Sequence, residues 1–379
     1  MPISRKKSRI VWSRSSKNCA RDKRSNGMND KNEVRGEKAM SVNRNQEPIT
    51  LAAARTEDME ALRRIAIEAF APDLQRYGTM PQGIETREWH EQGMADGSYL
   101  AIFAGERLAG GARIFDLGDG RFRLGSLFVD PSLHGRGIGS ATLAAIEQRH
   151  PEAKEWSLDT PAGSERNHRF YRHAGYVKVG ENCPDPASDF LLFDYLKLPL
   201  LAVIRDADLP WPAAETQERS IAPIADERNY GLRQAARAVL ADAEGRIALM
   251  RVERDDYHKL PGGGIEGDED AYAALRRELQ EEVGANIEIG EAIGMTIEYV
   301  AGHRRKQFSY AYEARSIGSP SAPELTKSEQ AAGFAPMWTA PEEAVRLMES
   351  DRPKTYVGAF IRARDLAILR TYLDRQAAE

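Results

Sequence analysis

The sequence predicts an α/β protein with two folded domains, and three observations support this. The chain has 379 residues, which at roughly 150 residues per domain gives two or three folded units. Apolar residues make up 41% and charged residues 29%, enough apolar material to bury sizeable cores. Strand-like runs alternate with amphipathic helical runs in two halves that a proline-containing segment separates, a pattern typical of α/β architecture.

Composition divides the chain into four segments. Residues 1–47 are rich in Lys, Arg, Ser and Asn without an apolar period, and we expect a disordered basic tail there. Residues 48–198 form the first predicted domain. Residues 199–228 read as a linker because prolines disfavour regular structure, and residues 229–379 form the second domain. The prolines of the linker are Pro199, Pro210, Pro212 and Pro223.

The first domain begins with a helix and continues with strands. Its helix carries apolar residues at helical spacing, namely Met59, Leu62, Ile65, Ala66 and Phe70. Strands are expected over Tyr99–Ala104, Arg113–Asp116, Arg121–Val129 and Trp156–Asp159, with a glycine turn at Gly110-Gly111. A helix over Ser164–His173 and two closing strands complete a three-layer α/β unit.

Charge and cysteine content exclude several classes of protein. Residues 1–44 carry a net +9 and the remainder −14, for −5 overall. No apolar run approaches the roughly 20 residues of a membrane span, and no apolar segment follows the basic start as in a signal peptide. Cys19 and Cys183 cannot make a disulfide framework. We therefore expect a cytoplasmic protein that neither spans nor binds a membrane.

The second domain contains an acidic helix that points to a divalent cation. On a helix over this segment, Glu278, Glu281 and Glu282 stand at i, i+3 and i+4 and share one face, ~6 Å apart along the axis. Three carboxylates that close repel one another. Carboxylate oxygens are hard ligands, so Mg²⁺ or Mn²⁺ shared with a substrate phosphate is the expected partner. The preceding glycines at 262–264 let the main chain approach a ligand.

This segment resembles the Nudix hydrolase signature at every fixed position. Gly263 is followed after five residues by Glu269, and after seven more by Arg277-Glu278-Leu279; Glu281-Glu282, Gly284 and Ala285 complete it. The resemblance covers about 150 residues. It implies an α/β/α sandwich that hydrolyses a nucleoside diphosphate linked to another group, with Mg²⁺ or Mn²⁺ held by the three glutamates.

The resemblance also implies roles for the neighbouring residues. Arg277 would orient a carboxylate, and Glu269 would be a supporting acid. Family members often draw a general base from a later loop, and Glu329 is our candidate, with Glu324 and Glu298 as alternatives. The substrate would be a small nucleotide-derived molecule whose identity the sequence leaves open.

A glycine-rich turn marks a second phosphate-binding segment, in the first domain. An apolar strand ending at Val129 leads to Gly135-Arg136-Gly137-Ile138-Gly139 and then a helix. Free main-chain N–H groups at a helix start attract phosphate. A dinucleotide-binding fingerprint would open a βαβ run, whereas this turn follows several strands.

This arrangement resembles the GNAT N-acetyltransferases over about 150 residues. Their loop usually begins with Gln or Arg, and His134 stands there in this chain. The resemblance implies acetyl-CoA as co-substrate and a small amine as acceptor, with Tyr171 protonating the leaving thiolate. Asp116, Glu85 and Asp159 are alternatives for the base. The residues that would contact acetyl-CoA are Val129, His134, Gly135, Arg136, Gly137, Ile138, Gly139, Ser140 and Asn167.

Three functions for the whole chain fit these motifs. The first is a bifunctional enzyme that joins an acetyltransferase to a metal-dependent pyrophosphohydrolase. The second keeps the hydrolase and makes the first domain a sensor that binds acetyl-CoA without turnover. The third uses the basic tail to bind nucleic acid, and the acidic remainder of the chain argues against it. The sequence leaves the oligomeric state open.

Overall fold

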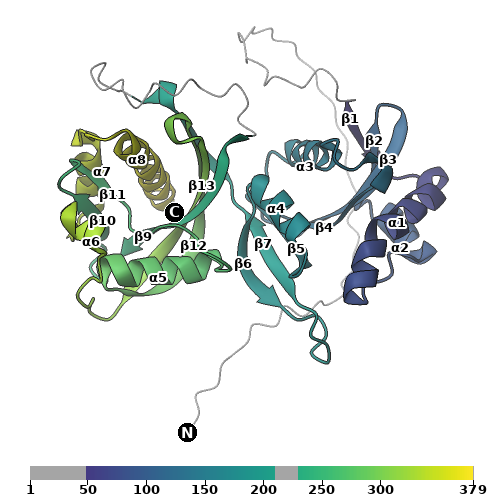
Figure 1. The fold of residues 1–379 in the computed structure, drawn as a ribbon, viewed down its shortest axis with the longest axis horizontal. Helices are drawn as coiled ribbons and strands as arrows, with labels where there is room; N and C mark the ends of the chain where they lie inside the picture. Colours follow the sequence, from purple (N-terminus) through teal and green to yellow (C-terminus); the bar gives the residue numbers. More distant parts are fainter. Residues whose placement is uncertain (1–47, 210–228, 379) are drawn as a thin grey trace. The chain divides into compact units, whose positions relative to one another are not determined.

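The computed structural model of the chain describes residues 48–209 and 229–378 (Figure 1). The predicted tail and residues 210–228 of the predicted linker lie outside this range. The described residues form two mixed sheets of seven strands each, and helices cover both faces of each sheet. This confirms the predicted α/β fold class.

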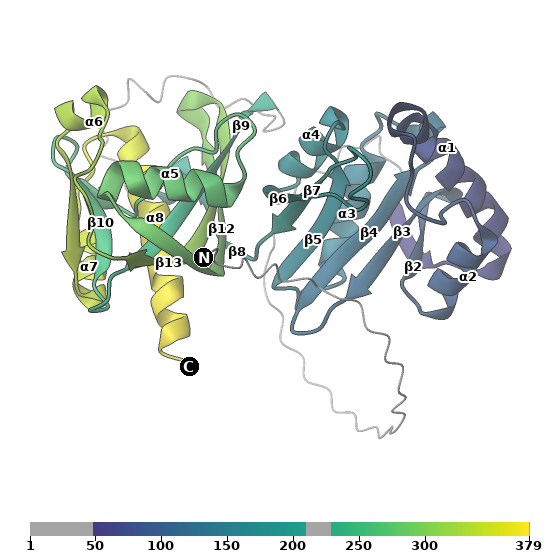
Figure 2. The same cartoon turned by 90° about the horizontal axis from the view of Figure 1, so that it is seen from below.

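The first sheet has the strand order β1-β2-β3-β4-β5-β7-β6, and Figure 2 shows β2 to β7 side by side. Neighbouring strands run antiparallel except β4 and β5, which are parallel. The strands are β1 (Ile49–Ala53), β2 (Tyr99–Ala104), β3 (Arg107–Asp116), β4 (Arg121–Val129), β5 (Glu155–Pro161), β6 (Val177–Asn182) and β7 (Leu192–Lys197). The helices are α1 (Met59–Tyr77), α2 (Arg87–Ala95), α3 (Ile138–Gln148) and α4 (Glu165–His173).

Alternate residues of the first sheet pack against helices on opposite faces. Tyr99 and Ala101 of β2 lie in one apolar cluster with Leu62 of α1. Ile102 of the same strand lies in another cluster with Leu143 of α3. Because side chains of a strand point to alternating faces, this pattern places the sheet between two helical layers, as expected for the predicted three-layer unit.

Strands β4 and β5 pair over only part of their length. Residues 121–123 of β4 pair with residues 155–157 of β5. Beyond this point β4 pairs with β3 alone, and β5 pairs with β7 alone, in the described structure. The sheet therefore opens between its two central strands at the end where the glycine turn begins.

The second sheet has the order β11-β10-β9-β13-β12-β8, and β14 pairs with the other side of β10. Pairs β9–β13 and β8–β12 are parallel, and the other pairs are antiparallel. The strands are β8 (Leu200–Arg205), β9 (Gly231–Ala241), β10 (Ile247–Val252), β11 (Tyr257–Lys259), β12 (Asn286–Val300), β13 (Arg305–Ile317) and β14 (Phe334–Thr339). The helices are α5 (Ala271–Val283), α6 (Lys327–Ala331), α7 (Pro341–Ser350) and α8 (Tyr356–Gln376).

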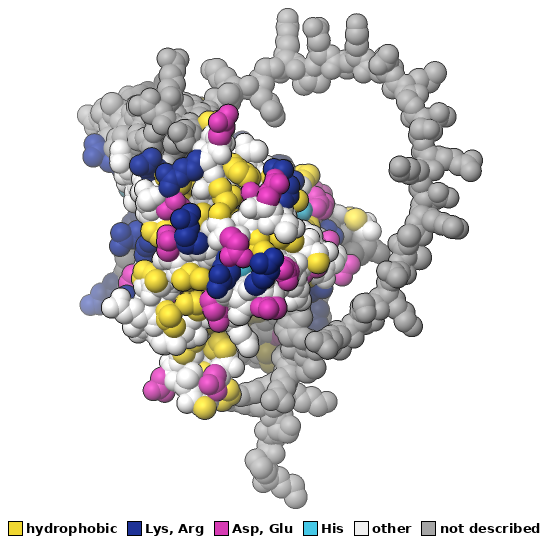
Figure 3. Space-filling view, turned by 90° about the vertical axis from the view of Figure 1, so that its right-hand side faces the viewer, with side chains coloured by type: hydrophobic (Ala, Val, Ile, Leu, Met, Phe, Trp, Pro, Cys, Tyr) yellow, Lys and Arg dark blue, Asp and Glu magenta, His cyan; other side chains and the backbone are white. Residues whose placement is uncertain are grey.

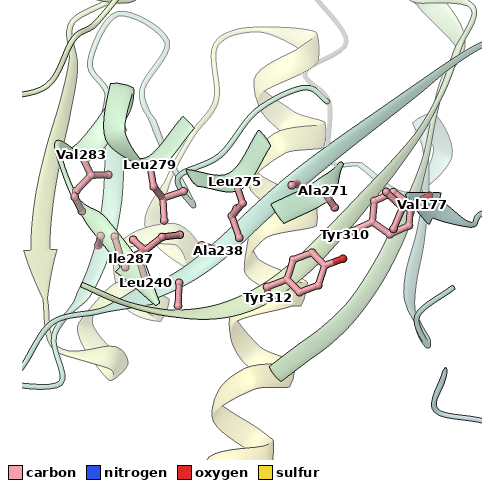
Figure 4. Packing of buried hydrophobic residues seen from close by; sticks show 14 of the residues in the cluster. Val177, Ala238, Leu240, Ala271, Leu275, Leu279, Val283, Ile287, Tyr310 and Tyr312 are labelled. Carbon is pink, nitrogen blue, oxygen red and sulfur yellow. The ribbon is translucent and has the colours of Figure 1, made fainter. Parts of the chain in front are cut away.

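Helix α5 covers one face of the second sheet, and α7 and α8 cover the other. Figure 4 shows Leu275 and Leu279 of α5 above Ala238 and Leu240 of β9. The intervening Val239 belongs to a separate cluster with residues of α7 and α8. This alternation produces the expected α/β/α sandwich.

Two predictions about local structure are wrong. Gly110-Gly111 lies inside β3 and not in a turn; a Cβ on Gly110 would collide with the main chain at Phe128, so close strand approach explains the glycine. Residues Leu200–Arg205, predicted as linker, form strand β8, because they pair with β12 and bury Ile204. The remaining domain boundaries stay predictions.

Two further features concern the surface and the helices. No helix within the described ranges is long and apolar enough to cross a membrane. On the molecular face shown in Figure 3, basic and acidic side chains are interspersed with apolar ones.

Candidate functional sites

Helix α5 presents the predicted carboxylates directly after the glycine loop. Asp270 caps its start by accepting a hydrogen bond from the N–H of Ala273 at 2.8 Å. Gly284 ends it in the left-handed conformation, with φ of 70°. A Cβ on Gly284 would also collide with the carbonyl of Ser321. These residues fix both ends of the helix that carries Glu278, Glu281 and Glu282.

Arg277 joins the helix to the loop that precedes it. Its Nε and Nη2 donate to the two carboxylate oxygens of Glu269 at 2.8 and 3.0 Å, and Nη2 also donates to the carbonyl of Gly264 at 3.0 Å. Nη1 donates to Glu278 at 2.9 Å and to Glu281 at 3.4 Å. The hydrogen bonds from Arg277 lower the pKa of the Glu269 carboxyl. This geometry suits the positioning role expected of Arg277.

Glu282 is the most deeply buried of the three carboxylates, with 3% of its side chain exposed. It forms an ion pair with the ammonium group of Lys259 and accepts the N–H of Gly262 at 2.8 Å. A buried carboxylate requires such partners. Lys259 therefore supplies the positive charge next to this carboxylate in the described structure.

Glu278 lies against the glycine loop. A Cβ on Gly263 would collide with the Glu278 carboxylate, so glycine is required there. Burial raises the pKa of Glu278, and the nearby Glu282 raises it further. A buried carboxylate that lies next to a second one makes a donor set suited to a hard divalent cation.

The third carboxylate does not join the other two. Glu281 is 46% exposed and its Oε2 faces Arg277. Across residues 48–209 and 229–378, no three His, Cys, Asp or Glu side chains are arranged to hold a metal ion. The expected convergence of all three glutamates is thus not present as the side chains stand. Glu278 and Glu282 fit a cation, and the metal-binding role of the trio stays a prediction.

The three candidates for a general base lie in different settings. Glu329 caps α6, accepting from the N–H and hydroxyl of Thr326, both at 2.8 Å. Glu298 is 1% exposed and bonded to Gln307 and Arg364. Glu324 is exposed, and its main-chain N–H donates to the carbonyl of Glu281 at 2.7 Å. Glu324 is therefore the candidate whose chain adjoins the carboxylate helix.

A cavity of about 1450 Å³ occupies the first domain where β4 and β5 separate. Residues 124–129 of β4 and 159–161 of β5 line it, together with the start of α4 and the end of α1. All the residues predicted to contact acetyl-CoA line this cavity except Arg136. The sequence motif and the opening of the sheet thus coincide.

The glycine turn has the conformation of a main-chain anion site. Gly135 and Gly137 have φ of 78° and 77°, which only glycine adopts readily. Gly137 caps α3 without a side-chain hydrogen bond to its first N–H groups. The His134 ring bonds to the carbonyl of Val129 at 2.9 Å, so its side chain fixes the loop to the end of β4.

Tyr171 and Asn167 both project from α4 toward this cavity. Burial raises the pKa of the Tyr171 phenol, and the charge of Asp159 adds to the increase. A phenol that keeps its proton at neutral pH can donate it to a leaving group. Asn167 donates to the hydroxyl of Thr160 at 2.9 Å, which holds α4 at the end of β5.

The candidates for the base that would accept the amine proton differ in whether they line the cavity. Asp159 and Glu85 line it, and Asp116 does not. Asp159 is ion-paired with Arg123. Ser126, which is not among the predicted site residues, lines the cavity with a buried hydroxyl that has no hydrogen-bond partner among the described residues.

A group of buried arginines in the second domain is likewise not among the predicted site residues. Arg233 and Arg237 lie four residues apart on the mostly apolar strand β9, and Arg237 is 4% exposed. Charged residues are almost never buried without a partner. The even spacing of two arginines in a mostly apolar strand is the signal that could have identified them.

Comparisons with known proteins match both domains. The model of the acetyltransferase (GNAT) family matches residues 59–176, and the model of the NUDIX domain matches residues 231–357. An RNA pyrophosphohydrolase of Teredinibacter turnerae is 36% identical over 89 residues, which cover 23% of this chain and 52% of the relative. One of Alkalilimnicola ehrlichii is 32% identical over 124 residues, covering 33% and 64%. The chain thus spans about half to under two thirds of the length of these relatives.

Among solved structures, the PaiA N-acetyltransferase of Thermoplasma acidophilum in complex with coenzyme A is 18% identical, with a TM-score of 0.33. The similarity covers 38% of this chain and 97% of that one. Each matched range contains most strands of one sheet and one of the two motifs described above. The chain therefore combines a domain of the GNAT acetyltransferase family with a domain of the NUDIX family.

Proposed function

We propose that the chain is a bifunctional enzyme. The second domain hydrolyses a phosphoanhydride bond in a nucleotide-derived substrate with Mg²⁺ or Mn²⁺, and the first transfers an acetyl group from acetyl-CoA to a small amine. The observation that supports the hydrolase most strongly is the pairing of Glu278 and Glu282 beside a glycine loop that Arg277 ties to the same helix. The relatives named RNA pyrophosphohydrolase support this class of bond.

Glu278 and Glu282 would hold the divalent cation, with Glu281 joining them once its side chain turns from Arg277. When bound, the cation neutralises phosphoryl charge and lowers the pKa of a water ligand. Arg277 keeps Glu269 and the Gly264 carbonyl in place. We place Glu324 ahead of Glu329 as the base that accepts the proton of the attacking water, because Glu329 already caps α6.

A hydrolysis screen tests this half. Nucleoside triphosphates, dinucleotides, nucleotide sugars and a 5′-triphosphorylated oligonucleotide would be incubated with Mg²⁺, and phosphorus NMR would identify the bond broken. Glu281→Gln and Glu282→Gln should abolish cleavage, whereas Glu288→Gln, an exposed position on the next strand, should not. Cleavage that persists in a chelator would contradict the proposal.

In the first domain, the amine nitrogen would attack the thioester carbon, and the carbon–sulfur bond would break. Tyr171 would give its proton to the departing thiolate, and the amine proton would pass to Asp159, Glu85 or water. The glycine turn would bind the diphosphate of acetyl-CoA through main-chain N–H groups. The cavity between β4 and β5 supports this assignment because it reaches both the turn and Tyr171.

A second function has specific support. Residues 124–129 of β4 offer no carboxylate, and His134 replaces the usual first loop residue, so the first domain would bind acetyl-CoA as a sensor without turnover. Release of free thiol from acetyl-CoA with a panel of amines distinguishes the two functions. Binding of acetyl-CoA without thiol release for any amine would favour the sensor.

A further inference from the structure

Four arginines lie on the face of the second sheet that α8 covers. Arg233 and Arg237 come from β9, Arg305 from β13 and Arg364 from α8. Arg237 and Arg364 are 4% and 1% exposed, and Arg233 and Arg305 are half-buried. Strands β9 and β13 are adjacent and parallel, with Arg305 opposite Gly231 and two residues before the partner of Arg233. The arginines therefore come from adjoining parts of the sheet and its covering helix.

Among the described residues, only Arg364 of this group has carboxylate partners. It donates to both oxygens of Asp365 at 2.6 and 3.0 Å and to Glu298 at 3.4 Å. Burial opposes its charge, but Asp365 and Glu298 hold the pKa of Arg364 above its usual value. Glu298 also accepts the side-chain amide of Gln307 at 2.8 Å. Both buried carboxylates are thus already engaged.

The other three arginines have no ion pair within the described part of the chain. The Nε atoms of Arg237 and Arg305 are buried without a hydrogen-bond partner there, and Arg233 donates to the neutral amide of Gln307, at 2.9 Å. Burial and the charge of Arg364 lower the pKa of Arg237 to about 10. Such groups destabilise a fold unless something neutralises them. These three guanidinium groups therefore keep N–H donors that no described carboxylate satisfies by a direct ion pair.

These arginines adjoin the glycine loop that also contacts the α5 carboxylates. A Cβ on Gly264 would lie 3.1 Å from Nη2 of Arg233, and one on Gly262 would lie 3.0 Å from the Cα of Arg237. Glu278 meets the intervening Gly263. The partial exposure of Arg233 and Arg305 gives the group an open side.

We propose that Arg233, Arg237 and Arg305 form a binding site for a phosphate group. Guanidinium groups offer several N–H donors in a planar array that matches phosphate oxygens, and a phosphate would satisfy the unpartnered Nε atoms. The loop at 262–264 touches both the arginines and the carboxylates of α5. This phosphate would therefore be one that neighbours the phosphoryl group cleaved at α5. That last identification rests on the proposed hydrolase function, whereas anion binding by the arginines does not.

Calorimetric titration with inorganic pyrophosphate, in EDTA, tests the site without hydrolysis. The full chain should bind pyrophosphate. Arg305→Gln and Arg233→Gln should each raise the dissociation constant about tenfold or more. Arg315→Gln, an exposed arginine on the same strand β13, should bind like wild type. Binding at the glycine turn of the first domain would be common to all variants and would not alter this comparison. Equal affinity in all four proteins would overturn the proposal.

Thermal unfolding in buffer without phosphate or sulfate separates a ligand site from a structural one. Because Arg305 has no ion pair among the described residues, Arg305→Gln should melt at the same temperature as wild type or higher, and pyrophosphate should stabilise it less. If Arg305→Gln and Arg233→Gln both melt well below Arg315→Gln, the arginines stabilise the fold and the proposal fails.

Glu281→Gln separates this proposal from the hydrolase function. The variant should lose cleavage and keep wild-type affinity for pyrophosphate, because the arginine that Glu281 contacts is Arg277, which is not one of the three arginines of the proposed site. Absence of pyrophosphate binding in an active wild type would contradict the phosphate site alone. Unchanged cleavage by Glu281→Gln would contradict the hydrolase function alone.

Discussion

The candidate phosphate sites of the two domains are built from different groups. In the first, the candidate site is made of main-chain groups: Gly135 and Gly137 adopt positive φ, and no side chain caps the N–H groups at the start of α3 in the described structure. In the second, the site is made of charged side chains, with Arg277 bound to three carboxylates and Lys259 to a fourth. A main-chain site depends on local conformation, while a side-chain site depends on every partner of each charge. Substitutions should therefore affect the two domains differently.

The largest effect is expected where the side-chain site meets the main chain. In Gly263→Ala, the new methyl group would collide with the Glu278 carboxylate, so the loop or the helix must shift. Small displacements of catalytic groups cost rates of about 100-fold. We expect hydrolysis to fall by ~100-fold or more in a phosphate-release assay, with release of thiol from acetyl-CoA unchanged.

Gly231→Ala provides the matched control. A Cβ there would lie 3.8 Å from its nearest neighbour, the carbonyl of Arg304, which is ordinary contact. This variant should hydrolyse like wild type. If Gly263→Ala also retains full activity, the close contact with Glu278 has no role in catalysis.

The second-largest effect is expected in the first domain, from a substitution that tests whether this domain is a catalyst. Tyr171→Phe removes the phenol that we propose as proton donor, and general acids contribute about 100-fold or more. We expect kcat for acetyl transfer to fall by ~100-fold while acetyl-CoA binds with wild-type affinity in calorimetry. The Tyr171 pKa is raised, so its proton remains available across the neutral range.

Tyr176→Phe serves as the comparison, because Tyr176 is a buried neighbour of Tyr171 that does not line the cavity. The kcat of Tyr176→Phe for acetyl transfer should stay near the wild-type value. Equal losses in the two variants would mean that Tyr171 contributes packing alone.

Both candidate sites were predictable in outline because each depends on a short motif. The spacing of Glu278, Glu281 and Glu282 placed them on α5 next to a glycine loop, and the glycine turn before α3 coincides with the cavity. Local spacing cannot show where long side chains turn. Glu281 therefore faces Arg277, and Glu329 caps a helix, in ways the motif does not encode.

Other features depend on contacts between distant parts of the chain. Residues Leu200–Arg205 become a strand only because β12 offers an edge, and Gly110 is needed because Phe128 of β4 lies against it. The arginine group combines β9, β13 and α8, and its outermost members, Arg233 and Arg364, are 131 positions apart in sequence. No window of the sequence contains these partners together, so periodicity could not assemble them.

A smaller effect should follow from strain in the glycine turn. Gly135 has φ of 78°, and a Cβ added there would meet no atom within 4 Å, so only backbone conformation opposes a side chain. Gly135→Val should cost ~1–2 kcal/mol and weaken acetyl-CoA binding roughly tenfold. Gly135→Asn should lose less, because asparagine tolerates positive φ. Equal affinity in both variants, measured by calorimetry, would show that the loop does not need this conformation to bind its ligand.

The smallest effect concerns the pH dependence of stability in the first domain. His90 is fully buried; its ring bonds to the Tyr99 hydroxyl at 3.0 Å and to the Ile84 carbonyl at 2.9 Å. Burial lowers the pKa of His90 below its ordinary value of 6.5, so the folded state favours the neutral ring. Its contribution is therefore present above pH 6.5 and is lost as pH falls from there toward the lowered pKa. The melting temperature of His90→Gln should change less than that of wild type between about pH 7.5 and pH 5.5. His150→Gln, at a partly exposed position, should follow wild type; identical pH profiles for His90→Gln and wild type would show that protonation of His90 does not limit the acid stability of this domain.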